Sequence, residues 1–248
     1  MSENDVRQAL GVVLNKIEQA CQRRRPELQN VTPLLVAASK FKSVDYILEA
    51  YKEGQRHFGE NYVQELIEKA NNPVILEKCK DIKWHFIGHL QSNKVNKILC
   101  VPNLHMIETV HSQKLAAQIN ESWPKFGSPD TKLKIFIQVN TSGEAEKSGI
   151  EPKEVCNLAK YILDDCPNLQ LHGLMTIGKY GYDPKDGPNP DFITLLKCRD
   201  NLCKTLSLDW KNINLSMGMS SDYEQAIEMG STNVRVGTSI FGERPQIN

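Results

Sequence analysis

The first stretch whose residues could do chemistry is LLVAASKFK, residues 34–42, in which an apolar run ends in Lys40 and Lys42. A lysine at the end of an apolar strand is partly desolvated, and burial favours the neutral amine. A neutral amine can attack a carbonyl carbon and form a Schiff base. The alternative is that Lys40 only extends its ammonium group to solvent from the rim of the fold. Both interpretations stay open at this point, and Lys40 is the candidate for covalent chemistry.

Two stretches near the end of the chain carry residue types that hold phosphate groups. SMGMS, residues 216–220, has two hydroxyls and a glycine, and VGTSIFG, residues 236–242, has Gly237 followed by two hydroxyls. A glycine amide has no side chain to shield it, and amides and hydroxyls together cradle an anion. The two stretches therefore favour an anionic ligand, with a phosphate as the expected group.

Arg235 lies two residues before Gly237, so the two positions face the same side of a strand. The guanidinium could reach a ring nitrogen or an oxygen of a bound cofactor. The alternative is a salt bridge inside the fold, with Glu60 or Glu108 as the acidic partner. Together with Lys40, these residues describe a site for a phosphate that also bears a carbonyl group. Pyridoxal 5'-phosphate combines the two groups.

The elements that must position these residues alternate along the chain. Helical patterns, several with a serine at the expected N-cap (Ser43, Ser112, and Ser220 or Ser221), separate eight β-rich runs. The runs cover residues 34–40, 57–61, 83–89, 104–109, 133–140, 169–178, 213–220 and 233–242. Alternating strands and helices predict a parallel sheet. Eight units in 248 residues favour one closed (β/α)8 barrel, whose functional residues follow the carboxyl ends of the strands.

The rival fold is an open doubly wound sheet, which usually has a glycine-rich turn after an early strand. The turn after the first run here is SKFKS, without glycine. We therefore expect one domain over residues 1–248, with an amphipathic N-terminal helix in residues 1–25 and the barrel over 34–242. The glycines and prolines of residues 179–192 predict a long loop at the functional end of the barrel.

Composition excludes several classes of protein. Lysine and arginine total 30 and aspartate and glutamate total 30, so no basic surface for nucleic acid is expected. No apolar run is long enough to span a membrane. The seven cysteines form no Cys-x-x-Cys pair, which is typical of reduced thiols in a cytosolic protein. The acidic start, with Glu3 and Asp5, argues against a mitochondrial transit peptide, although a mitochondrial pool stays open as an alternative.

The histidines raise the alternative of a metal-dependent barrel hydrolase. His85 and His89 are four apart, a spacing that brings ligands together on a helix rather than on a strand. His57, His105 and His172 fall early or midway in the runs instead of at their ends. We therefore expect packed or surface histidines and no metal site.

Seven motifs in register carry a family resemblance over residues 6–244. They are VAASKFK, GQRHFGENYVQE, IKWHFIGHLQSNK, QVNTSGEAEKSGI, GLMTIG, LSMGMSSDYEQAI and GSTNVRVGTSIFGER. On these motifs the chain resembles the pyridoxal phosphate homeostasis family, also called proline synthase co-transcribed homologs. The resemblance implies a single barrel similar to the N-terminal domain of alanine racemases, with pyridoxal phosphate bound covalently.

The resemblance also implies the cofactor-binding residues, which are Lys40, Asn61, Met175, Ser216, Arg235, Gly237 and Thr238. Lys40 is the implied point of covalent attachment, and Arg235 the implied partner of the pyridine nitrogen. The phosphate contacts are Ser216, Gly237 and Thr238, and the remaining two residues line the ring.

The implied function is that of a cofactor carrier rather than an enzyme. It would hold pyridoxal phosphate as a Schiff base on Lys40 and supply it to apo-enzymes that it meets transiently. The alternative is an amino-acid racemase or a related pyridoxal-phosphate enzyme. Racemases also use a tyrosine from a second domain and subunit, and the chain ends at Asn248, shortly after the eighth run. We expect a cytoplasmic monomer in which Lys42 and Lys147 are either auxiliary amines or solvated surface lysines.

Overall fold

The computed structural model describes residues 3–28, 30–128, 130–144, 148–179 and 181–243. In that part of the chain, eight parallel strands pair in sequence order and close on themselves as β1 pairs with β8. The strands are β1 Leu34–Ala38, β2 His57–Glu60, β3 Lys83–Phe86, β4 Leu104–Val110, β5 Leu133–Gln138, β6 Leu169–Met175, β7 Asn214–Ser216 and β8 Asn233–Val236. The closed parallel barrel confirms the predicted fold class.

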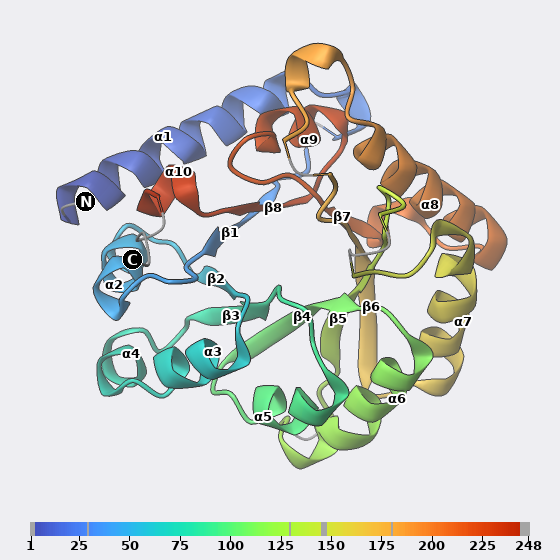
Figure 1. The fold of residues 1–248 in the computed structure, drawn as a ribbon, viewed down its shortest axis with the longest axis horizontal. Helices are drawn as coiled ribbons and strands as arrows, with labels where there is room; N and C mark the ends of the chain where they lie inside the picture. Colours follow the sequence, from blue (N-terminus) through green and yellow to red (C-terminus); the bar gives the residue numbers. More distant parts are fainter. Residues whose placement is uncertain (1–2, 29, 129, 145–147, 180, 244–248) are drawn as a thin grey trace.

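Helices cover the outside of the barrel, as Figure 1 shows with the strands as an inner ring. The helices are α1 Glu3–Gln22, α2 Val44–Lys52, α3 Val63–Ala70, α4 Pro73–Lys78, α5 Val95–Leu99, α6 Gln113–Ser122, α7 Val155–Asp165, α8 Pro190–Leu206, α9 Tyr223–Met229 and α10 Thr238–Phe241. Short 3-10 turns join several of these elements, for example Pro26–Leu28 before β1.

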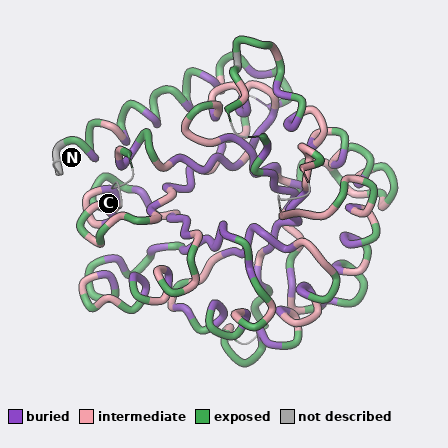
Figure 2. The backbone as a smooth tube through the Cα atoms, viewed as in Figure 1, coloured by how far each residue is buried: buried purple, intermediate pink, exposed green. Residues whose placement is uncertain are grey.

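Burial follows from this arrangement, because a strand inside a ring of helices has no face open to water. Figure 2 shows buried positions along the inner ring and exposed ones on the outer side of the helices. The main apolar core fills the layer between strands and helices. A second, smaller apolar cluster is formed by Met106, Phe136 and Met175. Much of the remaining interior is polar, and this polar interior positions the candidate site.

The N-terminal helix predicted in residues 1–25 is α1. Its buried face includes Val6, Leu10, Val13 and Ile17, at the spacing of one side of a helix. This face packs against α2, α9 and α10 beside the strands that open and close the barrel (Figure 1). Across the ranges that the structure describes, no helix combines the length and the apolar character needed to cross a bilayer.

Several local predictions differ from the structure, because seven of the eight predicted runs extend past the carboxyl end of their strand, the first of them to Lys40 although β1 ends at Ala38. The eighth run was predicted as strand to residue 242, but β8 ends at Val236 and residues 238–241 turn into α10. Helix α4 was not predicted, although Asn72 caps it and Pro73 opens it. The N-cap position of α9 is held by Asp222, not by a serine, which leaves Ser220 for another role.

Candidate functional site

The residues implied by the family motifs come from adjacent strands of the barrel. Strands β6, β7, β8, β1 and β2 are neighbours in the closed sheet. In that order they contribute Met175, Ser216, Arg235 with Gly237 and Thr238, Lys40, and Asn61. All of these positions lie at or just after the carboxyl ends of their strands, apart from Arg235, which lies one residue inside. The structure therefore brings the predicted residues to one mouth of the barrel.

Lys40 lies in a tight turn directly after β1. The turn is closed by Lys42 N–H, which donates to Ser39 O at 3.0 Å. Phe41 has a φ of 62°, a left-handed conformation that costs a bulky residue roughly 1–2 kcal/mol. Two contacts hold Phe41 there: its N–H donates to Glu65 Oε1 at 2.6 Å, and its ring lies 5.1 Å from that of Tyr62. The turn is thus fixed by Glu65 on α3 and by Tyr62, the residue directly before α3.

Lys69 on α3 connects the Lys40 turn to β2. Its amine donates to Ser39 O, Glu60 Oε1 and Glu65 Oε1, each at 2.7 Å. Ser39 Oγ donates to the same Glu60 oxygen at 2.6 Å. Burial raises the pKa of Glu60 to about 7, and the Lys69 ammonium opposes that rise. Lys69 could not be recognised from the sequence, because only its spacing of four from Glu65 indicates a pair.

The structure separates the two lysines that follow the first strand. Lys42 Nζ donates to Glu243 O at 2.7 Å and lies 5.6 Å from the ring centre of Tyr46. Burial lowers the pKa of Lys42. Because Phe41 departs from extended backbone, strand alternation does not carry from Lys40 to Lys42. Lys147, the other auxiliary amine considered, lies outside the described residues.

Arg235 is buried and held by two hydrogen bonds at the end of the barrel interior. Nη1 donates to Ser216 Oγ at 2.6 Å, and Nη2 donates to Thr176 O at 2.8 Å. Burial lowers the pKa of Arg235, and the negative charges of Glu108 and Asp222 oppose this. A guanidinium stays charged in proteins and only donates hydrogen bonds. Arg235 is thus a fixed donor and a fixed positive charge.

Glu108 is the buried acid that balances Arg235. It accepts from Ser216 Oγ at 2.6 Å, from Asn233 Nδ2 at 3.1 Å on both oxygens, and from His85 Nδ1 at 2.7 Å. Burial alone would raise the pKa of Glu108, but the hydrogen bonds from His85 and Ser216 and the charges of His85 and Arg235 together hold the pKa below its ordinary value. Of the two acids considered as partners for Arg235, Glu108 is the one that reaches it, through Ser216.

Ser216 uses its hydroxyl fully inside this network. Its Oγ donates to Glu108 and accepts from Arg235 and from Asn233, the last at 2.8 Å. A hydroxyl has one donor and two acceptor positions, so this hydroxyl is saturated. The predicted contact between Ser216 and a phosphate stays a prediction, and the structure assigns the side chain the task of orienting Arg235. Sequence analysis did not single out Asn233, which reads as an ordinary polar residue opening a strand.

The turn after β8 presents backbone amides at the mouth. Gly237 N–H and Ser239 N–H both point to Ser220 Oγ, at 3.2 and 3.3 Å. A Cβ on Gly237 would lie 2.9 Å from Ala38 O, so only glycine lets this turn approach β1 so closely. Thr238 follows as an exposed residue. Two amides converging on one oxygen are the arrangement expected of an anion site, although Ser220 was predicted as a helix cap.

Asn61 and Met175 lie on opposite sides of the mouth. Asn61 Oδ1 is buried and has no hydrogen-bond partner among the residues the structure describes. Its backbone runs against Gly88, where a Cβ would lie 1.8 Å from Asn61 O. Met175 is fully buried against Met106 and Phe136. The mouth therefore has an apolar surface around Met175 and a buried hydrogen-bond acceptor, Asn61 Oδ1, that a bound ligand could engage.

Comparison with known proteins places this geometry in a family. The family described as alanine racemase, N-terminal domain, matches residues 14–245. The pyridoxal phosphate homeostasis proteins of Bos taurus and Homo sapiens are each 55% identical over 95% of this chain and 86% of theirs. The chain belongs to the pyridoxal phosphate homeostasis protein family. This confirms the resemblance that the sequence motifs indicated.

Solved structures of similar proteins have the same barrel fold. PipY of Synechococcus elongatus with PLP bound matches with a TM-score of 0.75 and 29% identity, over 96% of this chain and 100% of PipY. An alanine racemase from Corynebacterium glutamicum matches with a TM-score of 0.65 at 12% identity, over 94% of this chain and 62% of the racemase. The second likeness is one of fold alone, and it shows that a member of this family shares its barrel with the racemases.

Proposed function

We propose that the protein binds pyridoxal phosphate covalently through Lys40 and supplies it to apo-enzymes. The names of the relatives and the cofactor in PipY support the choice of ligand. The observation that carries the proposal is the placement of Lys40, on a turn fixed by Lys69 and Phe41 at the carboxyl mouth of the barrel. A solvated surface lysine would need no such support.

The residues of the mouth fit the cofactor. The amides of Gly237 and Ser239 both donate to Ser220 Oγ, so a phosphate oxygen that replaced this hydroxyl would meet two converging donors. The unpartnered Asn61 Oδ1 offers an acceptor to a hydroxyl or a protonated nitrogen. Met175 supplies an apolar surface under a flat ring.

Arg235 limits what chemistry the site can perform. When bound, pyridoxal phosphate supplies an aldehyde that condenses with amines and a pyridine ring that withdraws electrons from them. Arg235 can donate a hydrogen bond but cannot accept one, so it cannot keep the ring nitrogen protonated. Its two bonds to Ser216 and Thr176 would hold it in place to donate to that nitrogen. A neutral pyridine is a weak electron sink, which suits storage of the cofactor better than turnover.

A transfer assay tests the carrier function. The protein is loaded with pyridoxal phosphate and mixed with the apo-form of a pyridoxal-phosphate enzyme in the presence of a phosphatase that destroys the free cofactor. We expect the wild type to restore activity that an equal amount of free cofactor does not. The Lys40→Ala variant should behave as the free cofactor does. Equal phosphatase sensitivity of the wild type and the free cofactor would contradict the proposal.

The same preparation tests the racemase alternative. The likeness to alanine racemases favours that reading only at the level of fold. Incubation with L-amino acids is expected to give D-isomers no faster than free pyridoxal phosphate does. Sustained turnover that disappears in Lys40→Ala would favour the enzyme over the carrier.

A further inference from the structure

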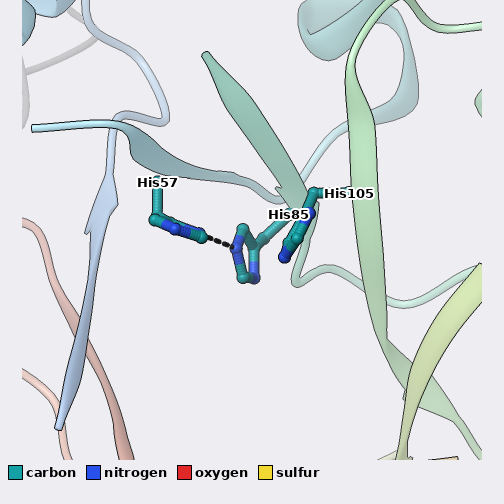
Figure 3. A group of neighbouring side chains, drawn as sticks. All are labelled: His57, His85 and His105. Carbon is teal, nitrogen blue, oxygen red and sulfur yellow. Dashed lines mark hydrogen bonds between the residues drawn. The ribbon is translucent and has the colours of Figure 1, made fainter. Parts of the chain in front are cut away.

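Three histidines meet at the amino end of the barrel, opposite the mouth that holds Lys40. His57 opens β2, His85 lies in β3, and His105 is the second residue of β4. Their ring centroids form a nearly equilateral triangle with sides of 5.1, 5.1 and 5.3 Å. One nitrogen from each ring lies within 4.8 Å of the others, and Figure 3 shows the rings gathered around one place.

A β-bulge brings His105 into this group. The register pairs Trp84 with Leu104 and His85 with Met106, so His105 is the extra residue on β4. A bulge re-aims the side chain that it inserts. Unbroken alternation would turn His105 away from the face that Met106 occupies. The sequence pattern, which expected separate packed histidines, contains no sign of this bulge.

We propose that His57, His85 and His105 form a binding site for a divalent transition metal, with Zn²⁺ as the expected ion. Imidazole nitrogens suit Zn²⁺ and its neighbours in the periodic table. At Zn–N distances of about 2.1 Å, two tetrahedral ligand nitrogens lie roughly 3.4 Å apart. His57 Nδ1 and His85 Nε2 are 2.8 Å apart, so this pair opens by roughly half an ångström to admit the ion.

Glu108 prepares His85 for this role. The carboxylate accepts from His85 Nδ1 at 2.7 Å, which directs the lone pair of Nε2 toward the other two rings. A carboxylate behind a histidine is the usual outer partner of a zinc ligand, because it fixes the tautomer and raises the basicity of the ring. The structure thus supplies a partner behind the ligand as well as the ligands.

A cavity gives the ion a way in. It has a volume of about 890 Å³ and lies between α1 and the start of β1 to β3. Its lining includes Ile17 and Cys21 of α1, His57 of β2 and Lys83 of β3. His57 is the proposed ligand that lines this cavity, so an ion would reach the cluster past the His57 ring. A site with three histidines and one open position has the pattern of a reactive rather than a closed structural zinc site.

Binding of Zn²⁺ and Co²⁺ to the full chain, after removal of bound metals with a chelator, tests the proposal. We expect one Zn²⁺ site per chain by calorimetry and visible d–d absorption of tetrahedral cobalt. The variants His57→Asn and His105→Phe should each weaken Zn²⁺ binding on the order of 100-fold, and Glu108→Gln by roughly 10–100-fold. The d–d absorption of bound Co²⁺ should be lost in each of the two variants that remove a histidine ligand. Circular dichroism and the thermal midpoint confirm that each variant is folded.

His89→Gln is the matched control, because His89 stacks on His111 in a different part of the fold, away from the cluster. All proteins are compared at the same cofactor content, since pyridoxal phosphate itself binds metals. The proposal is overturned if the wild type has no Zn²⁺ site, if His57→Asn and His105→Phe bind Zn²⁺ as tightly as the wild type, or if only His89→Gln loses the site. None of these results depends on whether the protein carries a cofactor.

Discussion

The two ends of the barrel offer opposite chemistry. At the carboxyl mouth the polar groups are donors and cations: Lys40, the Arg235 guanidinium and the amides of Gly237 and Ser239. At the amino end three imidazoles gather, two of them kept neutral by burial, with Lys83 and Lys134 nearby. The first end suits an anion that carries a carbonyl group, and the second suits a metal cation.

One hydrogen-bonded chain joins these ends through the interior. It runs from His57 to His85, then through Glu108 and Ser216 to Arg235. Each link is 2.6 to 2.8 Å long. Barrel interiors of this fold are usually filled by layers of branched apolar side chains. Here a polar path replaces part of that packing, and the two ends differ in chemistry while sharing Glu108.

The largest expected effect comes from removing this shared group. Glu108→Leu leaves the donors of His85, Ser216 and Asn233 buried without their acceptor, and Arg235 without a balancing charge. We expect the free energy of unfolding to fall by about 3–5 kcal/mol, measured by urea denaturation. The control Glu151→Leu removes an exposed pair with Lys153 and should leave the free energy of unfolding almost unchanged. An equal loss of stability in Glu108→Leu and Glu151→Leu would show that Glu108 stabilises the protein no more than an exposed acid does, which would contradict its role as the group shared by the two ends.

Lys69→Met tests the carboxyl mouth separately. It leaves the buried Glu60 without its cation and frees the turn that carries Lys40. We expect a loss of about 3 kcal/mol at pH 8 and a lower fraction of covalently bound cofactor. The stability loss should shrink toward pH 5, because an unpaired Glu60 can take up a proton. The control Lys52→Met removes an exposed pair with Glu49 and should leave both measurements unchanged.

Gly237→Ala probes the phosphate side of the same mouth. The added Cβ would lie 2.9 Å from Ala38 O, so the turn must move away from β1. We expect the affinity for pyridoxal phosphate to fall roughly tenfold, which corresponds to about 1.4 kcal/mol. Gly11→Ala, which meets open space in α1, should leave the affinity unchanged and raise stability by up to about 1 kcal/mol. An unchanged affinity in Gly237→Ala would remove this turn from the site.

Acid is expected to act on the amino end with the smallest effect. The pKa values of His57 and His105 are lowered to about 3 in the folded state, so the unfolded chain binds more protons between roughly pH 6.5 and pH 3. Stability is therefore lost as the pH falls through that window. Both rings are partly exposed, so we expect less than about 1 kcal/mol from each per pH unit.

The double variant His57→Asn/His105→Phe should lose less stability than the wild type over the same window. Thermal midpoints in metal-free buffer at pH 7, 6 and 5 measure the difference. Parallel curves for the two proteins would show that these rings are not held neutral.

The sequence was sufficient to predict the elements whose signals are local. The apolar runs located all eight strands, and Lys40, Asn61 and Gly237 could be placed at strand ends from the barrel alone. The lengths were overestimated where polar or glycine-rich residues continue a run, as after Val236. Helix α4 was not predicted, because its six residues are too few for a helical repeat of apolar positions to be recognised.

The rest depends on register, which no single run contains. Lys69 meets Glu60 only because a short loop lets α3 fold back on β2. His105 joins His57 and His85 only because β4 contains a bulge. Glu108 and Ser216 are 108 residues apart in the chain, and they meet through closure of the barrel. Such contacts follow from tertiary packing, so the spacing of residues along the sequence does not predict them.

The central claim is that Lys40, and not its neighbour Lys42, holds the cofactor at the carboxyl mouth. Reduction of the loaded protein with borohydride makes the link permanent, and tandem mass spectrometry of its peptides then identifies the modified lysine. We predict the pyridoxyl group on Lys40 in the wild type, and in Lys40→Ala neither that label nor the visible absorbance of the bound cofactor. A label on Lys42 in the wild type, or visible absorbance that persists in Lys40→Ala, would contradict the account.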